Sequence, residues 1–192
     1  AQAQPDVQIL QSKILLYGTH RVNSLGNRIQ YLGYGYCHGY GLPDTTSNGH
    51  VALDYASGAA MLVKREVFER IGLLREDYFM YYDDLEFCWR ARLAGCNVGL
   101  AEQSICHHRY DVRNMLGLLY YVQRNRLLTL LTLEKRRTLA LTLPCLLVAE
   151  VILGVYFLTR GWGATQWKLL RYFATPDTWQ AIAARRREVS RL

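Results

Sequence analysis

The stretch SGAAMLVKREVFERIGLLREDYFMYYDDLEFCWRARLAG, residues 57–95, decides the fold of this chain. A segment with strand character, Ala59–Val63, leads into residues 64–72, where apolar side chains recur with helical spacing. That helix is expected to end at Gly72, because glycine readily adopts the left-handed conformation that closes helices. A second helix over 83–95 also ends at a glycine. The alternation of strand and helix predicts an α/β fold.

The segments on either side extend this pattern. Before the central stretch we expect a strand at Val7–Leu16, a glycine-rich loop region over 18–50 and a strand at Val51–Tyr55. After it we expect short strands at Asn97–Ala101 and Ser104–His107 and a long helix at Val112–Leu133. The run GYGYCHGYG, residues 33–41, suits either a mobile substrate loop or a surface loop whose tyrosines cover the core.

Composition excludes several classes of protein. The chain has 192 residues, 51% hydrophobic and 20% charged, which is enough for a domain with a real core. A disordered tail, a collagen-like repeat and a small disulfide-stapled module are therefore excluded. The cysteines number five, an odd count without a CxxC pair, so reduced thiols in a cytosolic compartment fit best.

A hydrophobic segment, Thr138–Thr159, carries one charged residue, Glu150, and is long enough to cross about 30 Å of hydrocarbon. Basic residues lie on both sides of it, at 135–137 and in the tail beyond it, and both flanks favour the cytoplasmic face. A transmembrane span and a re-entrant or interfacial segment both stay open, with a buried helix pair as a third interpretation. For the re-entrant arrangement, Pro144 is expected to break the helix and allow a bend.

Two adjacent aspartates begin the second helix. Asp83 followed by Glu86 forms a D-x-x-E capping box, which leaves Asp84 at the first helical position. The helix dipole favours the charge of Asp84 and the neighbouring Asp83 opposes it. Such a carboxylate is a candidate general base, whereas the simpler interpretation is that both aspartates only cap the helix.

The ordered motifs of this stretch resemble the C-terminal half of the catalytic domain of family 2 glycosyltransferases, in particular the bacterial rhamnosyltransferase-like members. The resemblance rests on matches in order along the chain, at Ser57-Gly58-Ala59, Ile71-Gly72-Leu73, Phe79-Met80-Tyr81-Tyr82, Asp83-Asp84, Trp89-Arg90, Gly95, His107-His108 and Arg124-Asn125. It implies a partial GT-A (nucleotide-diphospho-sugar transferase) fold over residues 1–133, with a mixed sheet and flanking helices. Residues 134–192 would then form a membrane-associated helical region with a basic tail.

The resemblance also implies the chemistry. The activity would be inverting transfer of a sugar from a nucleotide-sugar donor to a lipid-linked or polysaccharide acceptor. The setting would be cell-surface polysaccharide synthesis at the cytoplasmic face of the bacterial inner membrane. Asp84, with Asp83, would be catalytic, and His107, or alternatively His108, would bind a divalent metal ion, Mg²⁺ or Mn²⁺. The implied substrate-binding residues are Ser57, Gly58, Ala59, Tyr81, Tyr82 and Trp89, and packing is the alternative for the aromatic ones.

The chain departs from the family pattern in three respects. Asp83 stands in place of a glutamate, and Arg75 stands in place of an aspartate. In that family, the nucleotide-binding region with its D-x-D metal motif lies upstream of the strand that Val7–Leu16 matches, and the present sequence does not include it. We therefore expect the isolated chain to be inactive and the metal to bind only together with the upstream half.

Two other functions compete with catalysis. The first is a non-catalytic, membrane-associated scaffold that retains the glycosyltransferase fold. The second is nucleic-acid binding, which the sequence pI of about 9.3 suggests. We do not expect a nucleic-acid partner, because the basic residues cluster beside a hydrophobic segment rather than among stacking aromatic side chains.

Overall fold

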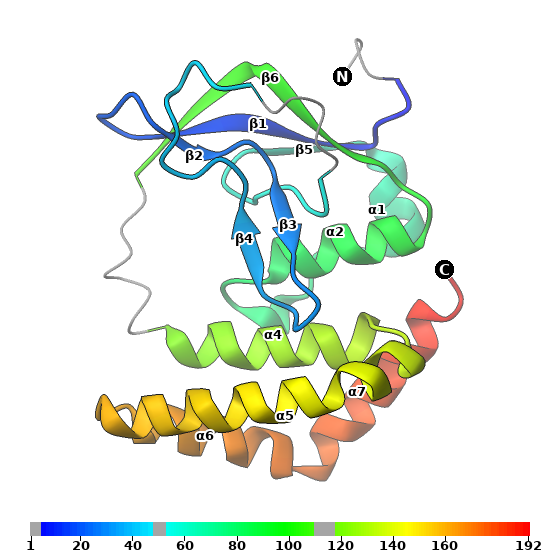
Figure 1. Cartoon of the computed structure of the whole chain (residues 1–192). Coiled ribbons are helices and arrows are strands. Elements are labelled where there is room, and N and C mark those ends of the chain that lie inside the picture. Colours follow the sequence, from blue (N-terminus) through cyan, green and yellow to red (C-terminus); the bar gives the residue numbers. More distant parts are fainter. Residues whose placement is uncertain (1–4, 48–52, 110–117) are drawn as a thin grey trace. The chain divides into compact units, whose positions relative to one another are not determined.

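The computed structural model describes residues 5–47, 53–109 and 118–192 (Figure 1). The chain divides into two compact units. Unit 1 contains residues 1–30 and 35–112 with the terminal Leu192, and unit 2 contains residues 31–34 and 113–191. The predicted domain limits, 1–133 and 134–192, stay a prediction.

Unit 1 is built on a mixed four-stranded sheet around β1 (Ile9–Leu16). The strand β6 (Val98–His108) runs parallel to β1 along its whole length. Two short strands pair with β1 in antiparallel fashion, β5 (Met61–Val63) near its start and β2 (Val22–Ser24) near its end (Figure 1). A separate ribbon joins β3 (Asn27–Ile29) to β4 (Gly35–Cys37). The expected α/β fold with a mixed sheet is confirmed for this unit.

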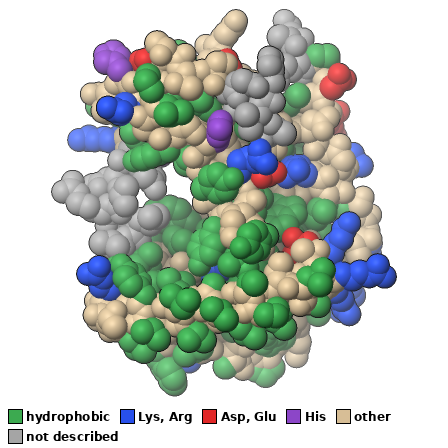
Figure 2. Space-filling model, viewed as in Figure 1, with side chains coloured by type: hydrophobic (Ala, Val, Ile, Leu, Met, Phe, Trp, Pro, Cys, Tyr) green, Lys and Arg blue, Asp and Glu red, His purple; other side chains and the backbone are tan. Residues whose placement is uncertain are grey.

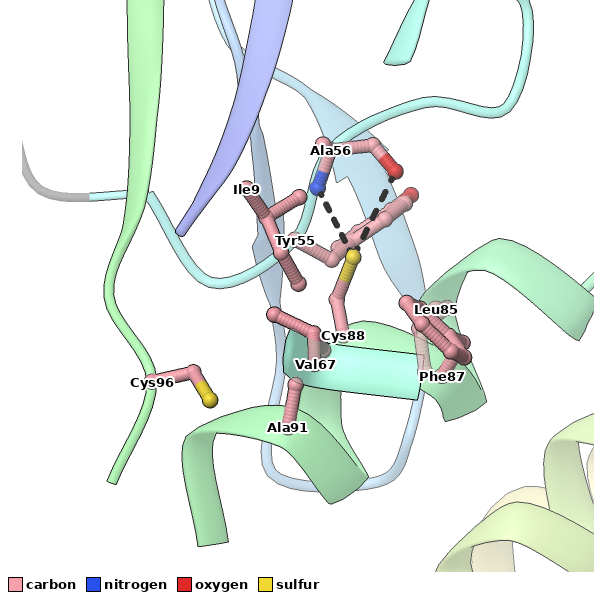
Figure 3. Close-up of a cluster of buried hydrophobic side chains, with 9 residues drawn as sticks. All are labelled: Ile9, Tyr55, Ala56, Val67, Leu85, Phe87, Cys88, Ala91 and Cys96. Carbon is pink, nitrogen blue, oxygen red and sulfur yellow. Dashed lines mark hydrogen bonds between the residues drawn. The ribbon is translucent and has the colours of Figure 1, made fainter. Parts of the chain in front are cut away.

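Two helices complete unit 1. The helix α1 (Arg65–Ile71) is followed by Gly72 at a φ of 79°, which confirms the predicted helix and its closing glycine. A 3-10 turn, η1 (Glu76–Tyr78), precedes α2 (Asp83–Leu93). These helices and the sheet enclose the core shown in Figure 3, and in that core the thiol of Cys88 lies against the backbone of Ala56. Its other members are Ile9, Tyr55, Val67, Leu85, Phe87, Ala91 and Cys96.

Three expectations about strands need correction. The two strands expected at 97–101 and 104–107 form one strand, β6, with an irregularity where Ala101 and Ile105 face successive residues of β1. The region over 18–50 also contains the short strands β2, β3 and β4. No strand covers the described part of 51–55, where Tyr55 makes an isolated bridge to Asn27, while residues 51 and 52 lie outside the described residues.

Unit 2 is helical. It contains α4 (Leu119–Leu133), α5 (Arg136–Thr159), α6 (Gly163–Ala174) and α7 (Pro176–Val189). Within the unit, α4 packs against α6 and α7, and α5 packs against α6. Residues 112–117 of the expected long helix lie outside the described residues. The break expected at Pro144 is wrong, because α5 continues through this residue as one helix.

Candidate active site

The carboxylate of Asp84 lies in the first turn of α2 and is held by two backbone N–H groups. The N–H of Gly58 donates to Oδ2 and the N–H of Leu85 donates to Oδ1, each at 2.8 Å. The contact with Gly58 comes from the loop before β5, so two segments far apart in sequence meet at this carboxylate. The structure therefore brings together Asp84 and the Ser57-Gly58-Ala59 segment.

The expected capping box is wrong. The helix begins at Asp83, and the capping position before it is occupied by Tyr82, whose side chain makes no capping hydrogen bond. Glu86 does not reach back to the helix start, because its carboxylate is buried and pairs with Arg75 and Arg90. At the N-terminus of α2, the carboxylate of Asp84 therefore accepts backbone hydrogen bonds, and no Asp83 cap is present beside it.

Burial raises the pKa of Asp84 to about 6, from an ordinary value of 3.8. The hydrogen bond from Gly58 opposes this rise, and the neighbouring charge of Asp83 adds to it. A carboxylate with this pKa is mostly ionised at neutral pH and is a stronger proton acceptor than an exposed aspartate. The environment therefore suits Asp84 to act as a general base.

The backbone that binds Asp84 is itself fixed by a buried polar network, which the sequence reasoning missed. The side-chain oxygen of Gln11 accepts hydrogen bonds from the Ser57 N–H at 2.7 Å and from the Asn27 amide at 3.3 Å. Its amide nitrogen donates to Ser24 Oγ at 3.0 Å. The side chains of Gln11 on β1, Ser24 on β2 and Asn27 on β3 are all buried. A glutamine in the otherwise apolar start of ILQSKILL was the signal for this network.

Two further side chains lie within the electrostatic reach of Asp84. Burial raises the pKa of the Tyr55 phenol and of the Cys37 thiol, and the charge of Asp84 raises both further. Tyr82 also adds to the rise at Tyr55. Cys37 lies on β4, inside the GYGYCHGYG run, so that run contributes one residue near the candidate base.

The aromatic segment before α2 has an unusual backbone. Phe79, Tyr81 and Tyr82 have φ values of 61°, 64° and 67°, although none is a glycine. Left-handed backbone at bulky residues is strained and is found mainly at functional sites. Tyr82 and Trp89 pack against the core, whereas Phe79 is exposed.

An ionic cluster holds the segment between α1 and η1 on α2. Both oxygens of the Glu86 carboxylate accept hydrogen bonds from Arg90, at 3.0 and 2.9 Å, and Arg75 donates to Oε1 at 3.0 Å. The guanidinium of Arg90 also donates to the carbonyls of Ile71 and Leu73. Arg75, which differs from the pattern that the sequence resembles, therefore forms an ion pair with the buried carboxylate of Glu86.

The two histidines lie elsewhere on the sheet. They are the last residues of β6, opposite Leu15 and Leu16 of β1, and Nδ1 of His108 lies 3.2 Å from Asn23 Oδ1. Ser57 binds Gln11, which is four residues from Leu15, or about 13 Å along a strand. The metal role of His107 or His108 stays a prediction.

A metal site of at least three ligands is not formed within residues 5–47, 53–109 and 118–192, since no such group of His, Cys, Asp and Glu side chains occurs there. Divalent Mg²⁺ and Mn²⁺ prefer several oxygen ligands. The described residues therefore do not fit such an ion by themselves.

Comparison with known proteins finds a local similarity to a curated protein. No protein-family model matches the chain. A segment of 60 residues, 31% of the chain, is 49% identical to the low-salt glycan biosynthesis hexosyltransferase Agl10 of Haloferax volcanii. The match covers 20% of that protein, so the chain spans about a fifth of this relative's length.

Proposed function

We propose that this chain supplies the catalytic base of a glycosyltransferase that works in glycan biosynthesis. The partial relative, described as a glycan biosynthesis hexosyltransferase, supports glycosyl transfer as the class of reaction. The observation that carries the proposal is the environment of Asp84, whose carboxylate is fixed by Gly58 and Leu85 and whose pKa burial raises to about 6.

In the proposed reaction, Asp84 accepts the proton of an acceptor hydroxyl. The hydroxyl oxygen forms a bond to the anomeric carbon of the donor sugar while the bond to the nucleotide diphosphate breaks. The leaving group departs with the bonding electron pair, and attack from the opposite side inverts the anomeric configuration. A positioned base of this kind contributes about 10²–10⁴-fold in rate.

Neighbouring residues have supporting roles in this proposal. The backbone at Ser57-Gly58-Ala59 orients the carboxylate, and Tyr81 lines the acceptor site from the strained segment, whereas Tyr82 of the same segment packs against the core. Asp83 tunes the basicity of Asp84 through its charge. Trp89, which packs against the core, positions α2 rather than binding substrate. A divalent ion, where bound, would neutralise the charge of the departing diphosphate.

We further propose a lipid-linked or polysaccharide acceptor and action at the cytoplasmic face of an inner membrane. The support is the apolar helix α5 and its basic flanks. The resemblance to rhamnosyltransferase-like family 2 members favours a bacterial cell-surface polysaccharide, whereas the relative comes from an archaeon. The chemistry proposed for Asp84 is the same in either lineage.

Substitution in an active transferase that contains this chain tests the proposal. Asp84→Asn is expected to lower turnover by about 10²–10⁴-fold and to leave the affinity for the nucleotide sugar unchanged, because an amide cannot accept the proton. Asp83→Asn is the matched control and should lose far less. Wild-type-like turnover by Asp84→Asn would refute the assignment.

The competing scaffold function predicts a different result. A scaffold that retains the fold without catalysis would show no transfer with any nucleotide sugar, and Asp84→Asn would change nothing. The fixed, basic carboxylate favours the enzyme, because a residue that only stabilises a helix end does not need a raised pKa.

A further inference from the structure

The helix α5 turns its apolar residues outward. Along it, the buried or half-buried positions recur about every three or four residues and form a single inward stripe, at 138, 139, 142, 146, 149, 150, 153, 154 and 157. The rest of the helix faces away from unit 2. Its large apolar side chains there are 44–81% exposed, at Leu141, Leu143, Leu147, Val148, Val151, Ile152, Val155, Tyr156 and Leu158.

The outward face of α5 is apolar, where a helix at the surface of a soluble protein would be polar. The inward stripe contains Thr142 and Glu150, whereas the outward face between the helix ends is apolar. The most apolar 18-residue window of the helix has a mean hydropathy of 2.2, yet only 11% of that window is buried. Figure 2 shows hydrophobic side chains gathered over this part of unit 2. An apolar surface of this extent requires a partner.

An ion pair at the middle of the helix fixes which face is inward. Glu150 pairs with Arg126 of α4, whose side chain is 0% exposed. Arg126 also donates to Gln123 Oε1 at 3.1 Å and to the Leu32 carbonyl at 2.9 Å, and its guanidinium lies 4.3 Å from the centre of the Tyr34 ring. The ion pair ties α5 to α4, and the other contacts, also within unit 2, hold the guanidinium of Arg126 in place.

This ion pair argues against a transmembrane span. A span over Arg136–Thr159 would place Glu150 near the bilayer centre, and Arg126 would have to accompany it there. That region of α4 also buries the polar side chains of Gln123, Arg124 and Asn125. Moving several ionisable and polar groups into hydrocarbon is costly. The arrangement instead suits a helix with one face in protein and one face in lipid.

The charges around the outward face indicate an anionic surface. Lys135, Arg136 and Arg137 are exposed at the start of α5, and Arg160 is exposed at its end, about 36 Å away along a helix of 24 residues. A helix lying in the membrane plane places both basic ends among the headgroups of one leaflet. On α6, the exposed side chains include Trp167 and Lys168, an aromatic and a basic residue of the kind found at membrane interfaces.

We propose that α5 lies flat in the interface of an anionic bilayer, with its outward face among the upper acyl chains. A second copy of the chain fits this face less well, because two antiparallel α5 helices would bring basic ends together. The inference deepens the proposed membrane location, but it does not require transferase activity. Its test can therefore fail while the proposed function holds, and the proposed function can fail while α5 still binds a membrane.

Vesicle flotation of the full chain tests the binding. The chain should float with phosphatidylcholine vesicles that contain about 30% phosphatidylglycerol and bind those without it more weakly. Val148→Asp/Ile152→Asp, on the outward face, should reduce binding at least about tenfold, because charges must enter the acyl region. Ile105→Asp, at an equally exposed apolar residue of unit 1, is the control and should bind as wild type does. Equal binding by all three proteins would overturn the proposal.

Depth measurements distinguish the orientations. Fluorophores attached to single cysteines at 141, 148 and 155 should be quenched equally by lipids labelled at a shallow depth. A deep maximum at 148 with shallower ends would establish a span and overturn the flat orientation. A dimer in light scattering that persists without lipid, together with unquenched probes in vesicles, would assign the face to a second copy and overturn the proposal as well.

Discussion

Asp84 combines two properties that oppose each other. Its carboxylate receives N–H groups from Gly58 and Leu85, which favour the charged form, while burial disfavours that form more strongly. The net effect is a raised pKa, near 6. A base with this pKa is ionised in the cell and still binds a proton readily, which is the compromise that general base catalysis requires.

The raised pKa makes a prediction about stability. Because the folded pKa is about 6 and the ordinary value is 3.8, the folded state binds this proton more tightly than the unfolded state. The stabilisation is fully present below about pH 4 and is lost as the pH rises through 6. Asp84→Asn cannot ionise, so its free energy of unfolding relative to wild type should rise between pH 4 and pH 8, on the order of 1–3 kcal/mol.

Denaturant unfolding of both proteins at pH 4 and pH 8 measures this difference. The comparison across pH removes any constant effect of replacing a carboxylate oxygen with an amide group. A difference that does not change with pH would show that the pKa of Asp84 is not raised.

For single residues, the sequence pointed to Asp84 as a candidate base but did not indicate which groups hold it. The spacing of the two aspartates left helix capping as the simpler interpretation, and the family resemblance made Asp84 the candidate base. The Gln11 network that fixes Ser57 was not foreseen, because it joins residues that are 46 positions apart and depends on which way β1 faces. Long-range polar contacts of this kind leave no local spacing in a sequence.

The Arg75–Glu86–Arg90 cluster shows how tertiary contacts override a local signal. The D-x-x-E spacing predicts that Glu86 reaches back to the helix start, but Glu86 is on the inward face and 1% exposed. A carboxylate at that depth needs opposite charges, and Arg90 is four residues along the same helix. The helix itself was correctly predicted, whereas the partners of its charged residues were not.

We predict that Glu86→Ala lowers the free energy of unfolding by about 3–5 kcal/mol, since it leaves Arg90 buried without a counter-charge. Arg75→Ala should cost less, about 1 kcal/mol, because its side chain is 20% exposed and water partly replaces it. Urea denaturation of the two variants checks the order. A larger loss for Arg75→Ala would contradict the view that Arg90 is the principal partner.

At the scale of the whole chain, hydrophobicity located α5 correctly, but the sequence did not show how α5 is held. Pro144 was expected to break the helix, yet α5 continues through it as one helix. The pairing of Glu150 with Arg126 also required the structure, because the two residues are 24 positions apart.

We expect the isolated chain not to bind a divalent metal ion. Since the described residues hold no group of three metal-binding side chains, millimolar Mg²⁺ or Mn²⁺ should leave the melting temperature of the chain unchanged within about 1 °C. The chain alone should also release no nucleotide diphosphate from nucleotide sugars. A clear metal-dependent rise in melting temperature, or turnover by these 192 residues, would contradict this expectation.

The central claim, that Asp84 is the base of the transfer reaction, is tested most directly by the pH dependence of kcat/KM in an active transferase that contains this chain. The rate should rise with pH to a plateau, with a midpoint near pH 6 that reports the pKa of Asp84. Asp83→Asn removes a neighbouring negative charge and should therefore move the midpoint to lower pH while retaining activity. A midpoint that stays in place in Asp83→Asn, or a rate that does not fall below pH 6, would contradict the claim.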